Sequence, residues 1–196
     1  MIDPRTGKGL PGQPEPVESA QWKSLLDGTD PALLRIRRRW RHLPHGPRCK
    51  VCAAPFHGVG GVLTRVILHG QAITNPTLCT TCFRKLNGHP GGAEVDVSVL
   101  FADIRGSTGI AETIGAAAFR DALQTFYQLA ARAVDDHGGF IDKYLGDGVM
   151  ALFIPVFAGE AHAERALVAA RELVASVERS VLPASGVRVG AGVHRG

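Results

Sequence analysis

Two acidic residues lie where carboxylates can bind a metal ion. Asp103 ends the apolar run Val99-Leu100-Phe101-Ala102, and Asp147 lies between two glycines in Gly146-Asp147-Gly148. A carboxylate that closes a buried strand must be paired, capped or bound to metal, because burying it alone is costly. Asp147 alone has an ordinary interpretation, since Asp-Gly is a favoured hairpin turn. Only its convergence with Asp103 would form a magnesium site for a nucleoside triphosphate.

A turn of small residues follows Asp103. Gly106-Ser107-Thr108-Gly109 precedes a helical region. Small residues ahead of a helix leave backbone N–H groups free to face a phosphate. Many strands end in such a turn, so this feature gains meaning only beside the two carboxylates.

The elements that must position these residues alternate along residues 93–196. Apolar patterning predicts a strand over 93–103, and the helical period predicts helices over 116–137 and 159–181. Two apolar runs around Gly146-Asp147-Gly148 indicate a hairpin, and residues 186–194 indicate a last strand. The order β-α-β-β-α-β is that of the ferredoxin-like split βαβ fold, of class α+β. There the first strand lies beside the hairpin, so Asp103 can approach Asp147.

These residues resemble the class III adenylate/guanylate cyclase catalytic domain. The resemblance covers about residues 93–196 and rests on three motifs, Phe101–Thr108, Lys143–Phe153 and Val187–Gly196. It implies that Asp103 and Asp147 hold two Mg²⁺ or Mn²⁺ ions, with the Ile104 carbonyl as a further ligand. It also implies phosphate contacts from the backbone of Gly106, Ser107 and Thr108. The implied reaction converts ATP to 3′,5′-cyclic AMP and pyrophosphate in signal transduction, by positioning and charge stabilisation.

The resemblance places Lys143 where the family selects the base. A lysine there goes with adenine, because an ammonium group can only donate and suits the acceptor N1. A glutamate would go with guanine, and the alternative for Lys143 is an ordinary lysine on an edge strand. The resemblance further implies a head-to-tail homodimer, in which the metal aspartates and Lys143 of one site come from different chains.

The family's later motifs have no match before Gly196. They comprise a second base-selecting residue and an Asn and an Arg that stabilise the transition state. We therefore expect a C-terminally incomplete domain with little turnover, since losing one such group costs factors of about 10² to 10³ in rate. A catalytically silent nucleotide-binding or dimerisation protein is the alternative.

The first part of the chain differs in charge. The net charge of +4 divides into +8 over residues 1–89, with 13 basic and 5 acidic residues, and −4 over residues 90–196, with 9 basic and 13 acidic residues. The change falls at the linker-like His89-Pro90-Gly91-Gly92. We expect a disordered tail over 1–28, a basic helix over 29–45, a metal-binding module over 46–89 and the catalytic domain over 93–196.

All four cysteines lie in that module, as the pairs Cys49/Cys52 and Cys79/Cys82. Two CxxC pairs predict a metal site, because each two-residue spacer points both thiolates at one ion. We expect structural zinc in a small zinc-ribbon-like module. An iron–sulfur cluster and a redox dithiol are the alternatives, and a disulfide framework has no export signal to support it.

The expected basic helix carries Arg35, Arg37, Arg38, Arg39 and Arg41. Such a helix fits either a solvated face or a zinc-containing nucleic-acid-binding protein, and a salt-sensitive gel shift would separate the two. No apolar run reaches the roughly 20 residues of a bilayer span, and the N-terminus resembles no secretory signal. We therefore expect a cytoplasmic protein without membrane insertion.

Overall fold

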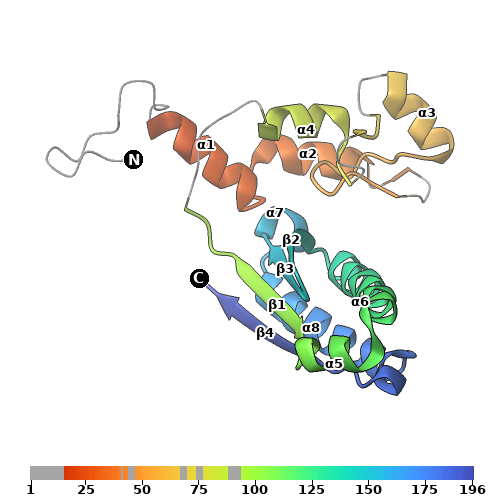
Figure 1. Ribbon diagram of the computed structural model, residues 1–196. Coiled ribbons are helices and arrows are strands. Elements are labelled where there is room, and N and C mark those ends of the chain that lie inside the picture. The colour runs from red at the N-terminus through yellow and green to blue at the C-terminus, as the bar shows by residue number, and fades with distance from the viewer. Residues whose placement is uncertain (1–15, 41, 44–46, 67–69, 74–76, 88–93) are drawn as a thin grey trace, which may run out of the picture. The chain divides into compact units, whose positions relative to one another are not determined.

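The computed structural model describes residues 16–40, 42–43, 47–66, 70–73, 77–87 and 94–196. The chain divides into two compact units, Met1–Val95 and Asp96–Gly196, and each is described by itself. Figure 1 labels the helices and strands of both.

The second unit is built on a four-stranded sheet. Its strands are β1 (Ser98–Ile104), β2 (Phe140–Leu145), β3 (Gly148–Phe153) and β4 (Val189–Arg195). The spatial order is β2-β3-β1-β4, and every neighbouring pair is antiparallel. The ferredoxin-like order expected from the sequence is therefore confirmed, with β1 and β3 in the centre.

Helices cover one face of this sheet. The long helices α6 (Ala116–Asp136) and α8 (His162–Glu178) pack against each other and against the strands, as Figure 1 shows. The core between them includes the fully buried Phe126, Phe153 and Leu173. Each such side chain contributes about 1.5–3 kcal/mol by leaving water. The shorter helices are α5 (Ser107–Ile114), α7 (Pro155–Ala158) and the 3₁₀ helix η1 (Leu182–Ser185).

The opposite face of the sheet is open within this unit. Along β1, Leu100, Ala102 and Ile104 are buried, whereas Phe101 and Asp103 are exposed. Successive side chains of a strand point to opposite faces. Asp103 therefore lies on the open face, away from the core.

The first strand is shorter than expected. We predicted a strand from residue 93, but β1 begins at Ser98, which pairs with Phe153 of β3 and Arg195 of β4. Residues 94–97 alternate polar and apolar side chains like a strand, but they lie outside the regular ladder. Alternation alone does not show where a strand finds its partners.

The first unit contains four helices among its described residues: α1 (Pro16–Leu26), α2 (Pro31–Trp40), α3 (Gly58–Val66) and α4 (Thr80–Asn87). Helix α1 corrects the expected disordered tail over 1–28, of which residues 1–15 lie outside the described residues. Its Trp22, Leu25 and Leu26 are at helical spacing, and Leu25 is buried. This apolar stripe stabilises a helix in a segment that is otherwise polar.

Helix α2 begins as its sequence predicts. The carboxylate of Asp30 accepts a hydrogen bond from the N–H of Leu33 at 2.7 Å, and Pro31 opens the helix. It spans ten residues, whereas we expected helix over 29–45. In the described part of the chain, no helix combines the length and apolar character that a bilayer crossing requires.

Candidate active site and cysteine cluster

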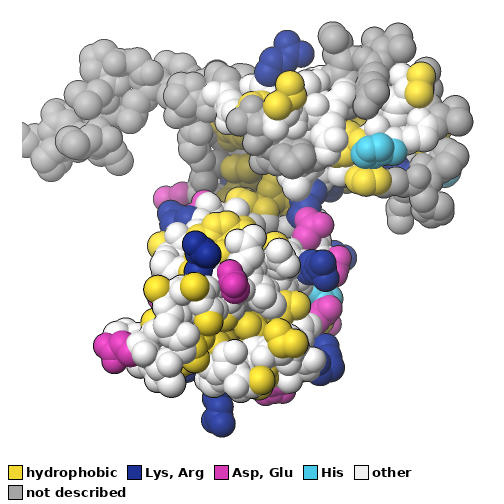
Figure 2. All heavy atoms as spheres, turned by 45° about the vertical axis from the view of Figure 1, so that its right-hand side comes forward, with side chains coloured by type: hydrophobic (Ala, Val, Ile, Leu, Met, Phe, Trp, Pro, Cys, Tyr) yellow, Lys and Arg dark blue, Asp and Glu magenta, His cyan; other side chains and the backbone are white. Residues whose placement is uncertain are grey.

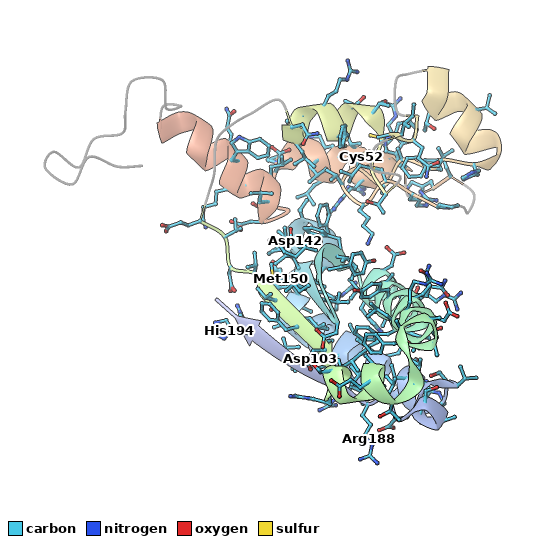
Figure 3. The ribbon with its side chains drawn as sticks, viewed as in Figure 1. Cys52, Asp103, Asp142, Met150, Arg188 and His194 are labelled. Carbon is cyan, nitrogen blue, oxygen red and sulfur yellow. The ribbon has the colours of Figure 1, made fainter. Side chains whose placement is uncertain are left out.

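Asp103 and Asp147 line one surface hollow of about 410 Å³, which we call the carboxylate hollow. Its other described lining residues come from β1, from the β2–β3 hairpin and from β4: Phe101, Ala102, Arg105, Leu145, Gly148, Val149, Gly190, Ala191 and Gly192. Figure 3 labels Asp103 near the end of β1. The structure thus brings together the two carboxylates that the sequence singled out.

The pairing of β1 with β3 creates this approach. Asp103 pairs with Gly148, and the N–H of Ile104 donates to the carbonyl of Asp147 at 3.2 Å. A Cβ at Gly148 would lie 3.3 Å from the Ala102 carbonyl and 3.7 Å from the Cβ of Asp103. The glycine therefore lets the hairpin lie close against β1, one residue from Asp147.

These donors fit a hard divalent cation. Carboxylate and carbonyl oxygens are the ligands that Mg²⁺ and Mn²⁺ prefer. The side chain of Asp103 is about half exposed (54%), so a hydrated ion can reach it. Its counter-charge is Arg105, whose Nε lies 3.5 Å from Oδ1 of Asp103.

The small-residue turn leads from Asp103 into α5. Gly106 has φ +68° and precedes the first helical residue, Ser107, with no side chain capping the helix. Glycine adopts this left-handed conformation without steric cost. The first N–H groups of a helix have no intrahelical acceptor. Ser107 and Thr108 therefore present backbone donors close in sequence to Asp103.

Lys143 lies elsewhere, on the edge strand β2. A bulge separates it from Ile141, and its Nζ lies 3.0 Å from Oδ2 of Asp142. Lys143 is not among the described residues that line the carboxylate hollow. The structure of one chain therefore does not bring Lys143 to the two carboxylates.

A tyrosine that the sequence did not single out supports the hairpin. The hydroxyl of Tyr127, on α6, donates to the carbonyl of Gly146, and its ring lies 4.4 Å from that of Tyr144. Burial, and secondly the charge of Asp147, raise the pKa of the Tyr127 hydroxyl. The phenol therefore stays protonated as a donor beside Asp147.

In the first unit, the four cysteine sulfurs form one cluster. Each CxxC pair contributes two thiols, and all four sulfur atoms lie within 4.8 Å of one another. Cys52 Sγ and Cys79 Sγ are 3.7 Å apart. Cys79 directly precedes α4 and Cys82 lies in its first turn, so one of the two pairs is presented by a helix N-terminus.

Hydrogen bonds among the four thiols lower the pKa of two of them and raise the pKa of the other two. Those from Cys49 and Cys52 lower the pKa of Cys79, and those from Cys52 lower the pKa of Cys49 to about 7. Bonding to the same neighbours raises the pKa of Cys52 and of Cys82. The cluster thus favours partial ionisation.

Arg37 lies against the first cysteine pair. Its Nε donates to the Val51 carbonyl at 2.6 Å and its Nη2 to the Lys50 carbonyl at 3.1 Å. Burial lowers the pKa of Arg37, while the charges of the nearby cysteines act to raise it. The basic helix α2 therefore contributes a cation to the cluster.

Comparisons with known proteins cover the second unit. The family described as "Adenylate and Guanylate cyclase catalytic domain" matches residues 92–196, just over half of the chain. The fold and the paired carboxylates thus occur in a chain that belongs to this family of nucleotide cyclase catalytic domains.

The similar curated proteins include cyclases of different substrates. An adenylate cyclase from Anabaena cylindrica is 35% identical over 111 residues, which are 51% of this chain and 21% of that protein. A uridylate cyclase from Xanthomonas perforans is 33% identical over 94 residues, or 48% of this chain and 39% of that protein. The chain thus spans a fifth to two fifths of these two relatives.

Among solved structures, the adenylyl cyclase CyaB from P. aeruginosa is 28% identical, with a TM-score of 0.47. The match covers 52% of this chain and 56% of that one.

Sequence reasoning missed the neighbours of the two aspartates. Arg105 lies inside the motif Phe101–Thr108, but nothing in its type or spacing placed its guanidinium beside Asp103. Tyr127 lies on a helix whose pattern indicated only a buried stripe. Both contacts depend on how α6 and β4 pack around the ends of β1 and the hairpin.

Proposed function

We propose that residues 96–196 form the metal- and phosphate-binding half of a cyclase active site that converts ATP to 3′,5′-cyclic AMP and pyrophosphate. The observation that carries this proposal is that Asp103 and Asp147 line one hollow beside the N-terminus of α5, in a chain of the cyclase family. This arrangement supports phosphoryl transfer that relies on positioning and charge stabilisation.

Each part of the site has a role in this proposal. Asp103, Asp147 and the Ile104 carbonyl would hold Mg²⁺ or Mn²⁺, two ions per site. These ions would supply charge neutralisation at the triphosphate and a more acidic ribose 3′-hydroxyl. The backbone N–H groups of Gly106, Ser107 and Thr108 would bind phosphate oxygens. The protein thereby orients the 3′-oxygen toward the α-phosphate.

Binding measurements test this site without requiring turnover. We expect Mn²⁺-ATP to bind the 196-residue chain in calorimetry, and Asp103→Asn or Asp147→Asn to weaken it at least about tenfold, the scale of lost metal-site groups. Asp121→Asn is the matched control, since Asp121 is an exposed carboxylate on α6 outside the hollow. Equal binding by all four proteins would contradict the proposal.

Adenine is the proposed base, through Lys143. The ammonium group of Lys143 is half exposed and can donate to N1 of adenine. Relatives named as adenylate and uridylate cyclases show why the base needs its own test. We expect the order ATP, then GTP and UTP, in competition binding, and a loss of ATP preference in Lys143→Glu. A wild-type preference for GTP or UTP would contradict this assignment.

A second copy would complete the site. Lys143 does not line the carboxylate hollow among the described residues, so a head-to-tail homodimer is needed to bring it there. Phe101 and Leu145 are about half exposed (48% and 49%), on or beside the open face of the sheet. Figure 2 shows hydrophobic side chains reaching the surface of this unit. Such exposed apolar side chains favour association.

Mixing two defective chains tests the dimer. Asp103→Asn and Lys143→Glu chains should each bind ATP poorly, and their mixture should regain one intact site per heterodimer. The control is each chain mixed with itself. Absence of recovery, in a mixture shown by sedimentation to form dimers, would refute the sharing of sites between chains.

We also propose that the first unit holds one structural Zn²⁺ through Cys49, Cys52, Cys79 and Cys82. With Zn–S bonds of about 2.3 Å, tetrahedral ligands lie about 3.8 Å apart. The 3.7 Å between the sulfurs of Cys52 and Cys79 agrees with this value. It is far longer than a disulfide bond of about 2.05 Å. Thiolates are the soft ligands that zinc accepts in structural sites.

Metal analysis tests this module. We expect one zinc per chain, and a tetrahedral thiolate spectrum after exchange with Co²⁺. Cys79→Ser should lose the metal, because Cys79 is fully buried within the cluster. If the purified protein is brown and contains iron and sulfide, the site holds an iron–sulfur cluster and the zinc assignment is wrong. A metal-free wild-type chain purified without chelators would refute the site.

A further inference from the structure

We infer that Arg105 competes with the metal ion for Asp103 and, once the metal is bound, contacts the phosphates of the nucleotide. This inference rests on the proposed cyclase site and assigns a second role within it. Arg105 is thus a binding residue for the polyphosphate and a regulator of metal affinity.

The backbone fixes Arg105 at the rim of the carboxylate hollow. Its N–H donates to the carbonyl of Arg188 at 2.8 Å, which continues the pairing of β1 with β4. One residue, Ile104, separates it from Asp103, so both side chains leave the chain on the open side of the sheet. Both line the same hollow.

The side chain of Arg105 lies across Gly190 of β4. A Cβ at position 190 would clash with Nε, Nη2 and Cζ of this guanidinium. Any side chain there would have to push the guanidinium aside, so Arg105 can lie over position 190 because that residue is glycine. Gly190 also pairs with Asp103 in the sheet register, so the glycine leaves a place for the guanidinium beside that carboxylate.

The charged residues that line the hollow indicate what the Arg105 guanidinium does beside Asp103. Among the described lining residues, Asp103 and Asp147 are the two anions and Arg105 is the one cation. Nε of Arg105 lies 3.5 Å from Oδ1 of Asp103, where it partly neutralises the carboxylate that a metal ion would use. A divalent ion carries more charge and binds both carboxylates, so it displaces the guanidinium.

The displaced guanidinium then has a new partner. Its side chain is 69% exposed and free to turn within the hollow. The planar fork of arginine matches two phosphate oxygens, and such charge-assisted hydrogen bonds are stronger than neutral ones. Arg105 directly precedes Gly106, where the phosphate-facing turn begins. One residue therefore senses the metal and the polyphosphate at the same end of β1.

The inference predicts effects of opposite sign. Arg105→Gln should bind Mn²⁺ alone about two- to fivefold more tightly, because an exposed ion pair contributes only weakly. The same variant should bind Mn²⁺-ATP at least about tenfold more weakly than wild type, because it loses a charged hydrogen bond to phosphate. Inorganic tripolyphosphate with Mn²⁺ should show the same loss as ATP.

Two titrations measure this pair of effects. Free Mn²⁺ is followed by electron paramagnetic resonance without nucleotide, and Mn²⁺-ATP and Mn²⁺-tripolyphosphate by calorimetry. Arg188→Gln is the matched control, because it removes an exposed arginine close by that does not line the hollow. Gly190→Ala keeps the charge of Arg105 but pushes the guanidinium aside, and it should also tighten Mn²⁺ binding.

Each outcome bears on one of the two proposals. Arg105→Gln that weakens Mn²⁺ and Mn²⁺-ATP alike would show that Arg105 merely holds Asp103 in place, and would overturn the inference. Unchanged affinities for both would overturn it as well. A folded wild-type chain that binds neither Mn²⁺ nor Mn²⁺-ATP would instead refute the proposed function itself. If Arg105→Gln fails to fold, Arg105→Lys tests the loss of the fork with the charge retained.

Discussion

Removing the hydroxyl of Tyr127 should loosen the turn that carries Asp147. This hydroxyl donates to the carbonyl of Gly146, the residue directly before Asp147. Tyr127→Phe keeps the ring and its contact with Tyr144 but loses this hydrogen bond. One hydrogen bond contributes about 0.5–1.5 kcal/mol net. If the turn must be ordered for Asp147 to bind metal, this free energy appears as a roughly two- to tenfold loss of Mn²⁺-ATP affinity.

The matched control is Tyr144→Phe. It removes the same group from the partner ring, and the Tyr144 hydroxyl makes no hydrogen bond to any described residue. Calorimetry of Mn²⁺-ATP should show the loss in Tyr127→Phe and wild-type affinity in Tyr144→Phe. Chemical unfolding of both variants should show that residues 96–196 remain folded.

Two results would refute this reasoning. Wild-type affinity in Tyr127→Phe would mean that the hairpin holds Asp147 without help from α6. An equal loss in both variants would mean that the ring pair, and not the hydrogen bond, sets the affinity. A loss confined to Tyr127→Phe, with little change in its unfolding midpoint, would establish a positioning role.

Three further predictions concern stability. The hydrogen bond from Arg195 lowers the pKa of Asp96. The stabilisation of the fold by this pair is therefore complete above the ordinary aspartate pKa and is lost as the pH falls through the lowered pKa. The unfolding midpoint of Asp96→Asn should consequently depend less on acid than that of the wild type. Gly139→Ala should cost about 1–3 kcal/mol in urea unfolding through overpacking, because its Cβ would lie 2.6–2.9 Å from the buried Phe153 ring, whereas Gly109→Ala should cost nothing, with no atom within 4 Å. Removing the metal from the cysteine cluster with a chelator should abolish the protease resistance of the first unit and leave that of the second unit unchanged, because only the first unit depends on this metal for folding.

Much of the second unit could be predicted because its pattern is local. Apolar periodicity marked α6, α8 and the β2–β3 hairpin, and their order along the chain allowed only a few topologies. Boundaries were less accurate, since β1 begins where Phe153 and Arg195 offer partners. In the first unit the tail was misjudged, because composition concealed the apolar stripe that includes Leu25.

The site residues divide in the same way. Asp103, Asp147 and the four cysteines could be named as candidates from their types and spacing, since a carboxylate after a buried strand and paired CxxC turns are common metal-binding patterns. Arg105 and Tyr127 could not be assigned from the sequence. Tyr127 acts through Gly146, 19 residues away in the chain, and the guanidinium of Arg105 lies over Gly190 of another strand.

By itself, the sequence determined the order of the elements and singled out the pair of carboxylates and the four cysteines as candidate ligands. These follow from periodicity and from the chemistry of single residue types. The tertiary structure decided that Asp103 and Asp147 share one hollow while Lys143 lies outside it. It also placed the Arg105 guanidinium over Gly190 and the Tyr127 hydroxyl at Gly146. The physical reason is that strand register and helix packing set distances between residues far apart in the chain, which no local pattern encodes.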